Sequence, residues 1–413
     1  MLKKVAFVCQ RYGREVNGGA ELQCRQFAEK LNTYYDVEIL TTCAVDYVTW
    51  ENEYADGDEY LNEVLVRRFP VDFPRDSKMF AALSGNIFNN KMHSSKEEEA
   101  WLCAQGPVSS RLLNYIAQHY EEYQAVIFVT YLYYHTAIGI LMDIPNKLLI
   151  PEAHDEPPIY LRHYKKVFQA PKGIIYNTTE EQEFIQKKFG NSHIPSVICG
   201  VGVDAPAPEE VPSAKERFGI EDDYVVYVGR IDVSKGCREL FDYFRAYKRR
   251  NPGKLKLVLA GKAVMDVPRD PDIISLGFIS DEEKFAIIRD AKCLVLASEF
   301  ESLSMVVLES MIMGRPVLVN GKCMVLKGHC KKSNAGLYFE NYAEFEGALD
   351  YLLSHPEQYE QMRENGKKYV RENYDWKVIV DKIRGMIESL EPVDAEQAER
   401  KRQEKRKLLE ERL

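Results

Sequence analysis

Two glutamates eight residues apart form the strongest chemical pattern in the chain. Glu301 lies in the segment SEFESLSMVVLE, just after a strand-like apolar run, and Glu309 lies in the helical stretch that follows. Two carboxylates at this spacing can accept hydrogen bonds from separate hydroxyl groups of one ligand. The backbone N–H groups at the start of the helix can receive phosphate or sugar oxygens. The alternative is a helix-start charge and a surface residue, but the apolar neighbours of Glu309 indicate that it needs a partner.

Two cations form the second pattern. Arg230 and Lys235 lie in YVGRIDVSKG, which has the order strand, loop, helix. Here they can face a diphosphate over the carboxyl edge of a sheet, and cations fixed in advance stabilise a charge that grows during a reaction. Taken alone, the segment would favour the interpretation as two ordinary surface cations.

Composition limits the class of protein. A chain of 413 residues predicts two domains. The net charge of −9 disfavours nucleic acid and allows at most peripheral membrane contact. The nine cysteines include no CxxC pair, so we expect a reduced, cytoplasmic chain. The opening MLKKVAFVCQ predicts a strand rather than a signal peptide, and the uncharged stretch 125–142 predicts a buried strand and helix rather than a membrane span.

Strand-like and helical segments alternate along both halves of the chain, which predicts the α/β class. Strands are expected over 4–9, 37–42, 64–69, 125–130, 147–151, 173–177, 196–199, 224–228, 256–260, 273–276, 292–296 and 317–320. Helices are expected over 20–31, 108–118, 179–189, 236–249, 281–289, 304–313 and 342–354. A proline-rich, charged segment over 205–221 predicts a linker between domains 1–204 and 222–375. Two doubly wound, Rossmann-like domains would then face each other across a cleft, with ligands at the carboxyl ends of their strands.

The two chemical segments together resemble the retaining glycosyltransferases of family 4, which have the GT-B fold. That family carries VGR…KG, then Glu-x7-Glu, then a helix and GxPV, which here is Gly314-Arg315-Pro316-Val317. Other matching segments are NGGAE at 17–21, AHDEPP at 153–158, VGVD at 201–204, Gly261, Gly277-Phe278, VNGKC…SNAGLY at 319–338 and YDW at 374–376. AHDEPP and VNGKC…SNAGLY indicate a subgroup. One departure is Ser302, where the family often has glycine.

The resemblance implies roles for individual residues. Arg230 and Lys235 would neutralise the diphosphate, Glu309 would hold the ribose hydroxyls, and Glu301 would hold hydroxyls of the transferred sugar. His154 would lie near that sugar from the other domain; alternatively it is a structural histidine held by Glu152, Asp155 or Glu156. The catalytic set is thus His154, Arg230, Lys235 and Glu301, and the donor-binding set is Gly18, Gly19, Gly277, Phe278, Ser302, Leu303, Ser304, Met305 and Glu309.

The resemblance also implies the ends of the domains. A helix over 376–390 would return from the second domain to the first. Residues 391–413 follow as a charged tail, which predicts a solvated helix or a frayed end.

The implied activity is transfer of a sugar from a uridine, guanosine or deoxythymidine diphosphate sugar, with no cofactor. The acceptor would be a glycan or lipid-linked saccharide, in bacterial surface polysaccharide synthesis. Alternatives are a GT-B nucleotide-sugar epimerase or hydrolase and, from another class, a non-catalytic sugar-nucleotide binding protein. A Rossmann dehydrogenase is disfavoured because neither half supplies GxGxxG.

No metal site is expected. Asp56-Gly57-Asp58 and Asp270-Pro271-Asp272 both spell DxD but read as turn carboxylates. Cys323, His329 and Cys330 lack the second ligand pair that a zinc site would need. Trp101 and the segment 105–107 are compatible with either acceptor contact or plain packing.

Overall fold

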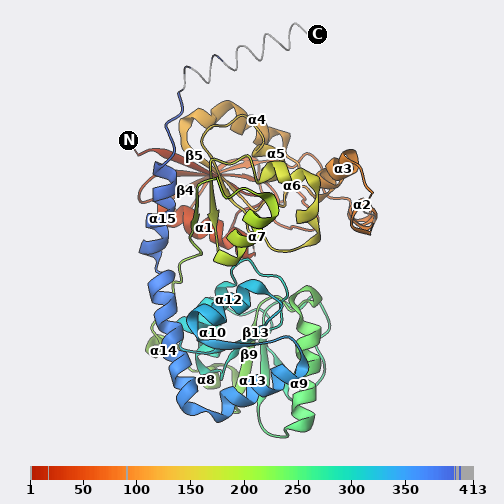
Figure 1. The fold of residues 1–413 in the computed structure, drawn as a ribbon, viewed down its shortest axis with the longest axis vertical. Coiled ribbons are helices and arrows are strands. Elements are labelled where there is room, and N and C mark those ends of the chain that lie inside the picture. The colour runs from red at the N-terminus through yellow and green to blue at the C-terminus, as the bar shows by residue number, and fades with distance from the viewer. Residues whose placement is uncertain (1, 17, 90–91, 395, 397–399, 401–413) are drawn as a thin grey trace. The chain divides into compact units, whose positions relative to one another are not determined.

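The computed structural model describes residues 2–16, 18–89, 92–394, 396 and 400. The chain divides into two compact units, Met1–Cys199 with Val380–Leu413, and Gly200–Ile379. Each unit is built on one sheet with helices around it, which confirms the predicted α/β class (Figure 1). Among these residues, no helix combines the length and apolar character needed to cross a membrane. Most of the predicted charged tail, and Asn17 of the NGGAE segment, lie outside the described residues.

The first unit contains an eight-stranded sheet. Its strands are β1 (Lys4–Val8), β2 (Asp36–Thr42), β3 (Gly57–Leu61), β4 (Val64–Phe69), β5 (Tyr123–Val129), β6 (Lys147–Ile150), β7 (Gly173–Tyr176) and β8 (Ser196–Ile198). Its helices are α1 (Gly19–Leu31), α2 (Ser77–Asn89), α3 (Ser95–Gln105), α4 (Ser110–His119), α5 (Tyr134–Gly139), α6 (Arg162–Val167) and α7 (Thr179–Phe189). The strand order is β3-β4-β2-β1-β5-β6-β7-β8, and β3 pairs antiparallel with β4 while the other pairs are parallel.

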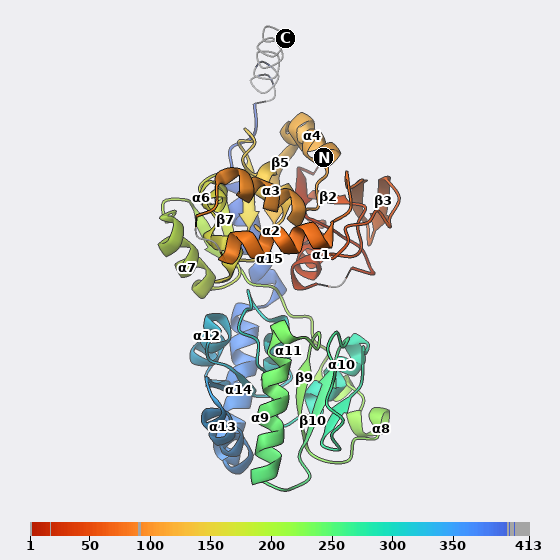
Figure 2. The ribbon, with the colours of Figure 1, turned by 90° about the vertical axis from the view of Figure 1, so that its right-hand side faces the viewer.

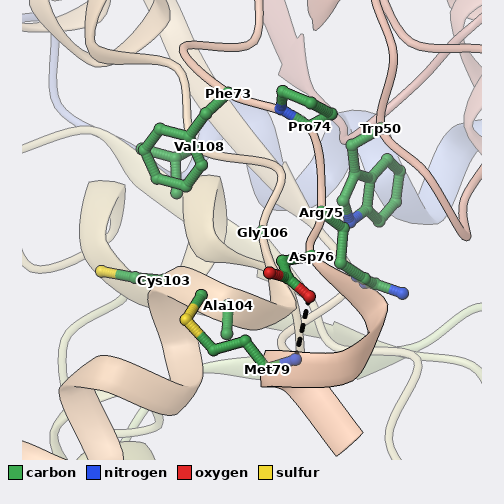
Figure 3. A pocket seen from close by; sticks show the side chains of 10 residues that line it. All are labelled: Trp50, Phe73, Pro74, Arg75, Asp76, Met79, Cys103, Ala104, Gly106 and Val108. Carbon is green, nitrogen blue, oxygen red and sulfur yellow. Dashed lines mark hydrogen bonds between the residues drawn. The ribbon is translucent and has the colours of Figure 1, made fainter.

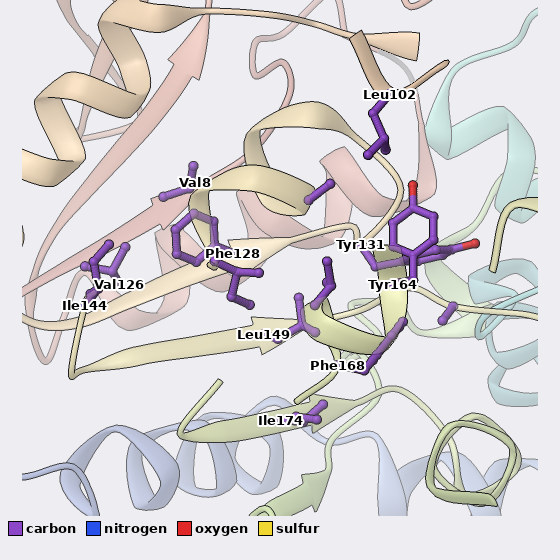
Figure 4. Packing of buried hydrophobic residues seen from close by; sticks show 14 of the residues in the cluster. Val8, Leu102, Val126, Phe128, Tyr131, Ile144, Leu149, Tyr164, Phe168 and Ile174 are labelled. Carbon is purple, nitrogen blue, oxygen red and sulfur yellow. The ribbon is translucent and has the colours of Figure 1, made fainter. Parts of the chain in front are cut away.

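One hydrophobic cluster of this unit lies on one face of its sheet (Figure 4). Alternate residues of neighbouring strands point to the same side, so Val8 of β1 and Phe128 of β5, which pair in register, enter one cluster. Aromatic rings from the helical side complete it, and the Tyr131 ring meets the Tyr164 ring edge-on at 4.8 Å between centroids. All seven residues of β5 are buried, as expected for a central strand covered on both faces.

Helix α15 (Trp376–Glu388) ends in the first unit, and the boundary between the units falls within it at Val380. Tyr35 donates a hydrogen bond to Glu388 at 3.0 Å, and Lys382 donates one to the carbonyl of Ile198 at 2.9 Å. The last turns of α15 are therefore part of the packing of the first unit.

The second unit contains a six-stranded parallel sheet. Its strands are β9 (Tyr224–Val228), β10 (Lys256–Ala260), β11 (Ile273–Ser275), β12 (Leu294–Leu296), β13 (Val317–Asn320) and β14 (Gly336–Phe339). Its helices are α8 (Ala214–Phe218), α9 (Cys237–Arg250), α10 (Asp281–Asp290), α11 (Met305–Ile312), α12 (Met324–Ser333), α13 (Tyr342–Ser354) and α14 (Pro356–Asn373). Figure 2 shows helices α9, α10 and α14 around strands β9 and β10. The strand order is β11-β10-β9-β12-β13-β14. Successive strands are added to one side of β9 and then, from β12 on, to the other side, as in dinucleotide-binding sheets.

Several elements differ from the sequence prediction. The first DxD segment is not simply a turn, because Gly57 and Asp58 begin strand β3, and Asp58 pairs with Arg67 of β4. Four of the five residues of β3 are exposed, so this edge strand lacks the apolar run that identifies a buried one. Helices α2, α3, α6, α12 and α14 and strand β14 were also not predicted.

Candidate active site

The candidate donor-binding residues of the second unit gather at the point where its strand order reverses. The loop after β9 carries Arg230 and Lys235, and the loop after β12 carries Glu301. β9 and β12 are neighbours in the sheet, with Leu294 opposite Val226. Parallel strands place both loops at the carboxyl edge, where such sheets bind ligands.

Lys235 and Glu301 meet directly. The Lys235 ammonium lies 2.8 Å from Glu301 Oε1, and the two side chains are 33% and 16% exposed. Gly236 makes this approach possible: its φ is +69°, and a Cβ there would lie 2.2 Å from the carbonyl oxygen of Ala297 at the end of β12. Only glycine combines this left-handed backbone with such close contact between two loops. The structure therefore joins two residues that the sequence patterns treated separately.

Arg230 lies in the same loop as Lys235. Its Nε is 3.0 Å from Asp232 Oδ2, and Tyr227 donates a hydrogen bond to the Arg230 carbonyl at 2.7 Å. Burial raises the pKa of Tyr227, with Cys237 adding to the shift, so the hydroxyl keeps the proton that it donates. Each of the two cations is thus held beside a carboxylate.

The start of helix α11 has a strained backbone. Ser304 is the residue before the helix, and it has φ 67° and ψ 77°, the left-handed region that is uncommon for a residue with a side chain. Such strain often accompanies functional sites. The carbonyl of buried Leu303 accepts a hydrogen bond from His329 at 2.8 Å, which fixes the loop that precedes the helix. The first helical turn begins at Met305, directly after Ser302, Leu303 and Ser304, and its N–H groups have no partner within the helix.

Glu309 has the partner that its apolar surroundings predict. It is 8% exposed, and its Oε1 lies 2.8 Å from the Lys284 ammonium on the neighbouring helix α10. Burial alone would lower the pKa of Lys284, but the carboxylates of Glu309 and Asp281 outweigh burial and raise it. Glu309 is therefore not a free surface residue.

Glycines bring three loops together at the same sheet edge, the loop after β9 and two others. The N–H of Gly261 donates to the carbonyl of Gly277 at 2.7 Å, and a Cβ on Gly261 would lie 1.9 Å from the carbonyl oxygen of Gly229. Phe278 follows Gly277 and is 76% exposed. The loops after β9, β10 and β11 thus form one packed layer beside an exposed aromatic ring.

A known protein family matches the part of the chain that carries these residues. The family model described as glycosyl transferases group 1 matches residues 210–369, which include Arg230, Lys235, Glu301 and Glu309. The segment of the chain that the model matches belongs to this family. Its resemblance to glycosyltransferases of family 4 is thereby confirmed.

Proteins similar to the chain include curated sequences and solved structures. The chain is 28% identical over 206 residues to alpha-D-kanosaminyltransferase of Streptomyces kanamyceticus, and this match covers 45% of the chain and 51% of the relative. The chain thus spans about half the length of this curated relative. Sucrose-phosphate synthase from Thermosynechococcus elongatus superposes with a TM-score of 0.67 at 16% identity, covering 94% of this chain and 99% of that one.

A second solved structure is HepE of Anabaena in complex with UDP and glucose. It superposes with a TM-score of 0.68 at 15% identity and covers 94% of this chain and 100% of that one. These structures confirm the predicted GT-B fold for this chain.

The first unit carries the glycine loop noted in the sequence. Gly18 precedes helix α1 and Gly19 begins it. Buried Glu21 on this helix accepts hydrogen bonds from Arg11 Nε at 2.7 Å and Gln10 Nε2 at 2.9 Å. A Cβ on Gly18 would lie 2.0 Å from Glu21 Oε2, so a larger residue would displace this carboxylate.

His154 also lies in the first unit. Its Nε2 is 3.3 Å from Glu156 Oε2, so Glu156 is the carboxylate beside it among the three considered from the sequence. Glu181 on α7 holds the loop, since it accepts hydrogen bonds from the N–H groups of Ala153 at 2.6 Å and Asn177 at 2.7 Å. Burial raises the pKa of Glu181 well above its usual range, and the nearby Glu152 adds to the shift.

Trp101 is a packing residue. It is 1% exposed, its ring contacts Phe80 and Phe88, and its Nε1 donates a hydrogen bond to Ser84 at 2.9 Å. The backbone of Gln105 accepts a hydrogen bond from Trp50 Nε1 at 2.7 Å. Figure 3 shows a small pocket nearby in the same unit, with Phe73, Met79 and Gly106 among its lining residues.

Sequence reasoning missed three supporting residues. Lys284 lies in no motif, yet it holds Glu309. Asn320 lies in the VNGKC segment but was given no role, and it donates a hydrogen bond to the carbonyl of Ala297 at 2.9 Å. His329 was considered only as a zinc ligand, but its two ring nitrogens contact the Leu303 carbonyl and the Tyr369 hydroxyl at 2.8 and 3.1 Å. Within the part of the chain that the structure describes, no three histidine, cysteine or acidic side chains are grouped as metal ligands would be.

Proposed function

We propose that the chain is a retaining, metal-independent glycosyltransferase that uses a nucleoside diphosphate sugar. One observation carries the proposal: Lys235 and Glu301 form an ion pair at the switch point of the second sheet, with Arg230 on the same loop. This set offers cations for a diphosphate and a carboxylate for sugar hydroxyls in one place. The runner-up activities, epimerase or hydrolase, would use the same groups without a second sugar substrate.

The two cations stabilise the negative charge that develops on the leaving diphosphate. When the bond between sugar and phosphate breaks, negative charge grows on the diphosphate oxygens. Arg230 and Lys235 meet that charge without reorienting solvent, and the first N–H groups of α11 add partial positive charge. We assign this role to these groups in place of a metal ion.

The two carboxylates bind different parts of the donor. Glu309 accepts hydrogen bonds from the ribose hydroxyls, and Glu301 accepts them from the transferred sugar. The backbone that connects the two glutamates faces the donor at four residues, Ser302, Leu303, Ser304 and Met305. Gly277 and Phe278 border the base. In the first unit, Gly18 and Gly19 allow close approach of the phosphates, and His154 contacts the transferred sugar.

Retention of configuration follows if the departing phosphate takes the proton of the acceptor hydroxyl on the same face of the sugar. No carboxylate nucleophile is then needed. The acceptor we propose is a glycan or lipid-linked saccharide in bacterial surface polysaccharide synthesis, and this rests on the sequence resemblance. A cytoplasmic site of action is supported by nine free cysteines, of which only Cys103 is exposed.

A thermal-shift screen tests the proposed donor class. UDP, GDP and dTDP and their sugars should be compared with NAD⁺ and with the free nucleosides. A ligand at about 100 times its Kd adds roughly 2.7 kcal/mol to the stability of the native state. We therefore expect at least one nucleoside diphosphate to raise Tm by about 2–4 °C, and the nucleosides to raise it less. Stabilisation by NAD⁺ alone would contradict the proposal.

A further inference from the structure

We infer that Lys284 is a positioning residue that fixes Glu309 for the ribose hydroxyls of the donor. This inference rests on the proposed function, because it assumes that Glu309 binds the ribose. Lys284 lies in none of the segments that carry the family resemblance, and it stands on α10 rather than on the loops that bear the candidate cations.

The geometry of the pair carries the inference. Lys284 Nζ lies 2.8 Å from Glu309 Oε1 and 3.0 Å from Asp281 Oδ1. The side chains of Lys284 and Glu309 are 18% and 11% exposed, whereas that of Asp281 is 90% exposed. The ammonium therefore joins a solvated carboxylate to a buried one. Of the two ion pairs that Lys284 makes here, the one with Glu309 is shielded from water and the one with Asp281 is not.

Two consequences follow for Glu309. A buried carboxylate is costly unless a cation accompanies it, so Lys284 offsets the cost of burying Glu309 where it stands. An ionised carboxylate has two oxygens, and Lys284 contacts Oε1. Oε2 is then the oxygen oriented for a ribose hydroxyl.

Lys284 also connects two parts of the candidate site. It is in the first turn of α10, which follows the Gly277-Phe278 loop, and Ser280 caps that helix through a hydrogen bond from the N–H of Glu283 at 3.2 Å. Because the capping box fixes the start of α10, the backbone of Lys284 is fixed as well. The lysine thereby ties the loop assigned to the base to the carboxylate assigned to the ribose.

Calorimetric titration with nucleotides tests this role. The probes are UDP and GDP and their 2′,3′-dideoxy counterparts, titrated into the full chain, Lys284→Met, Glu309→Gln and the double variant. We expect Lys284→Met to raise the Kd of the ribonucleotide about tenfold, because a charged hydrogen-bonding partner is lost or misplaced. The dideoxy nucleotides lack the hydroxyls, so their Kd should change less than about twofold on the same basis.

The double variant separates positioning from general destabilisation. If Lys284 acts through Glu309, the double variant should bind the ribonucleotide no more weakly than Glu309→Gln alone. Lys256→Met is a matched control, since Lys256 is 19% exposed and lies 2.7 Å from Asp272, but it stands at the amino end of β10. If Lys284→Met does not fold, Lys284→Gln removes the charge with less change in polarity and should show an intermediate loss.

The outcomes distinguish this inference from the function on which it rests. Binding of neither UDP nor GDP to the unaltered chain, or unchanged binding by Glu309→Gln, overturns the assignment of Glu309 and the inference with it. A clear loss in Glu309→Gln, together with unchanged binding in Lys284→Met or additive losses in the double variant, overturns the role of Lys284 alone.

Discussion

Replacing Lys235 with alanine should lower the rate of sugar transfer about a hundredfold, by analogy with the loss of one preorganised donor to a developing negative charge. Lys235 lies 2.8 Å from Glu301, so the change removes a cation from the diphosphate site and also leaves a largely buried carboxylate without this partner. The measurement is kcat and KM with the nucleotide sugar that gives the largest thermal shift.

The effect should depend on the place of the lysine in the fold. Lys292→Ala is a suitable control, because Lys292 lies 3.0 Å from Asp223 but precedes β12 at the amino edge of the same sheet. Arg230→Lys should also slow transfer, since lysine cannot present the planar guanidinium fork. A Lys235→Ala variant that transfers sugar at the normal rate would contradict the assignment.

Replacing Glu309 and Glu301 with alanine should separate binding of the nucleotide from use of the sugar. Glu309→Ala should weaken nucleoside diphosphate binding by roughly tenfold to a hundredfold, the usual cost of losing a hydrogen bond to a charged group. Glu301→Ala should leave binding of the free nucleotide nearly unchanged and impair turnover of the sugar donor. Calorimetric titration gives the first quantity and steady-state kinetics the second.

Only one ranking supports these roles. Glu309 is 8% exposed and pairs with Lys284, so its removal also leaves a buried lysine without that carboxylate. The unfolding temperature of each unliganded variant should therefore be measured beside the titrations. If Glu301→Ala loses the free nucleotide and Glu309→Ala keeps it, the two carboxylates have been assigned to the wrong parts of the donor.

The sequence predicts the buried parts of the fold well, for a physical reason. Strands such as β5 and β9 are nearly continuous apolar runs, because helices cover both faces of a parallel sheet. Strand β3 reads GDEYL and sits at an edge, so burial leaves little mark on its sequence. Helix α14 was missed for the same reason: only Gly366 and Val370 of its 18 residues are buried.

The candidate site could be predicted only in part. Motifs identify Arg230, Lys235, Glu301 and Glu309 because their spacing along the chain is informative. They do not show that Lys235 pairs with Glu301 across 66 residues, which depends on the close approach of Gly236 to Ala297. The role of Lys284 could not be predicted from the sequence, because a single lysine on an amphipathic helix has the pattern of a solvated charge. Its contact with Glu309 depends on the packing of α10 beside α11.

Retaining, metal-independent sugar transfer is tested most directly by proton NMR of the earliest product, formed in the presence of EDTA. The chain should be mixed with the nucleotide sugar selected by thermal shift and with a panel of saccharide acceptors. We predict a product whose new bond keeps the anomeric configuration of the donor, formed at a rate that EDTA does not change. An inverted product would contradict retention, and activity that EDTA abolishes and Mn²⁺ restores would contradict the role given to Arg230 and Lys235.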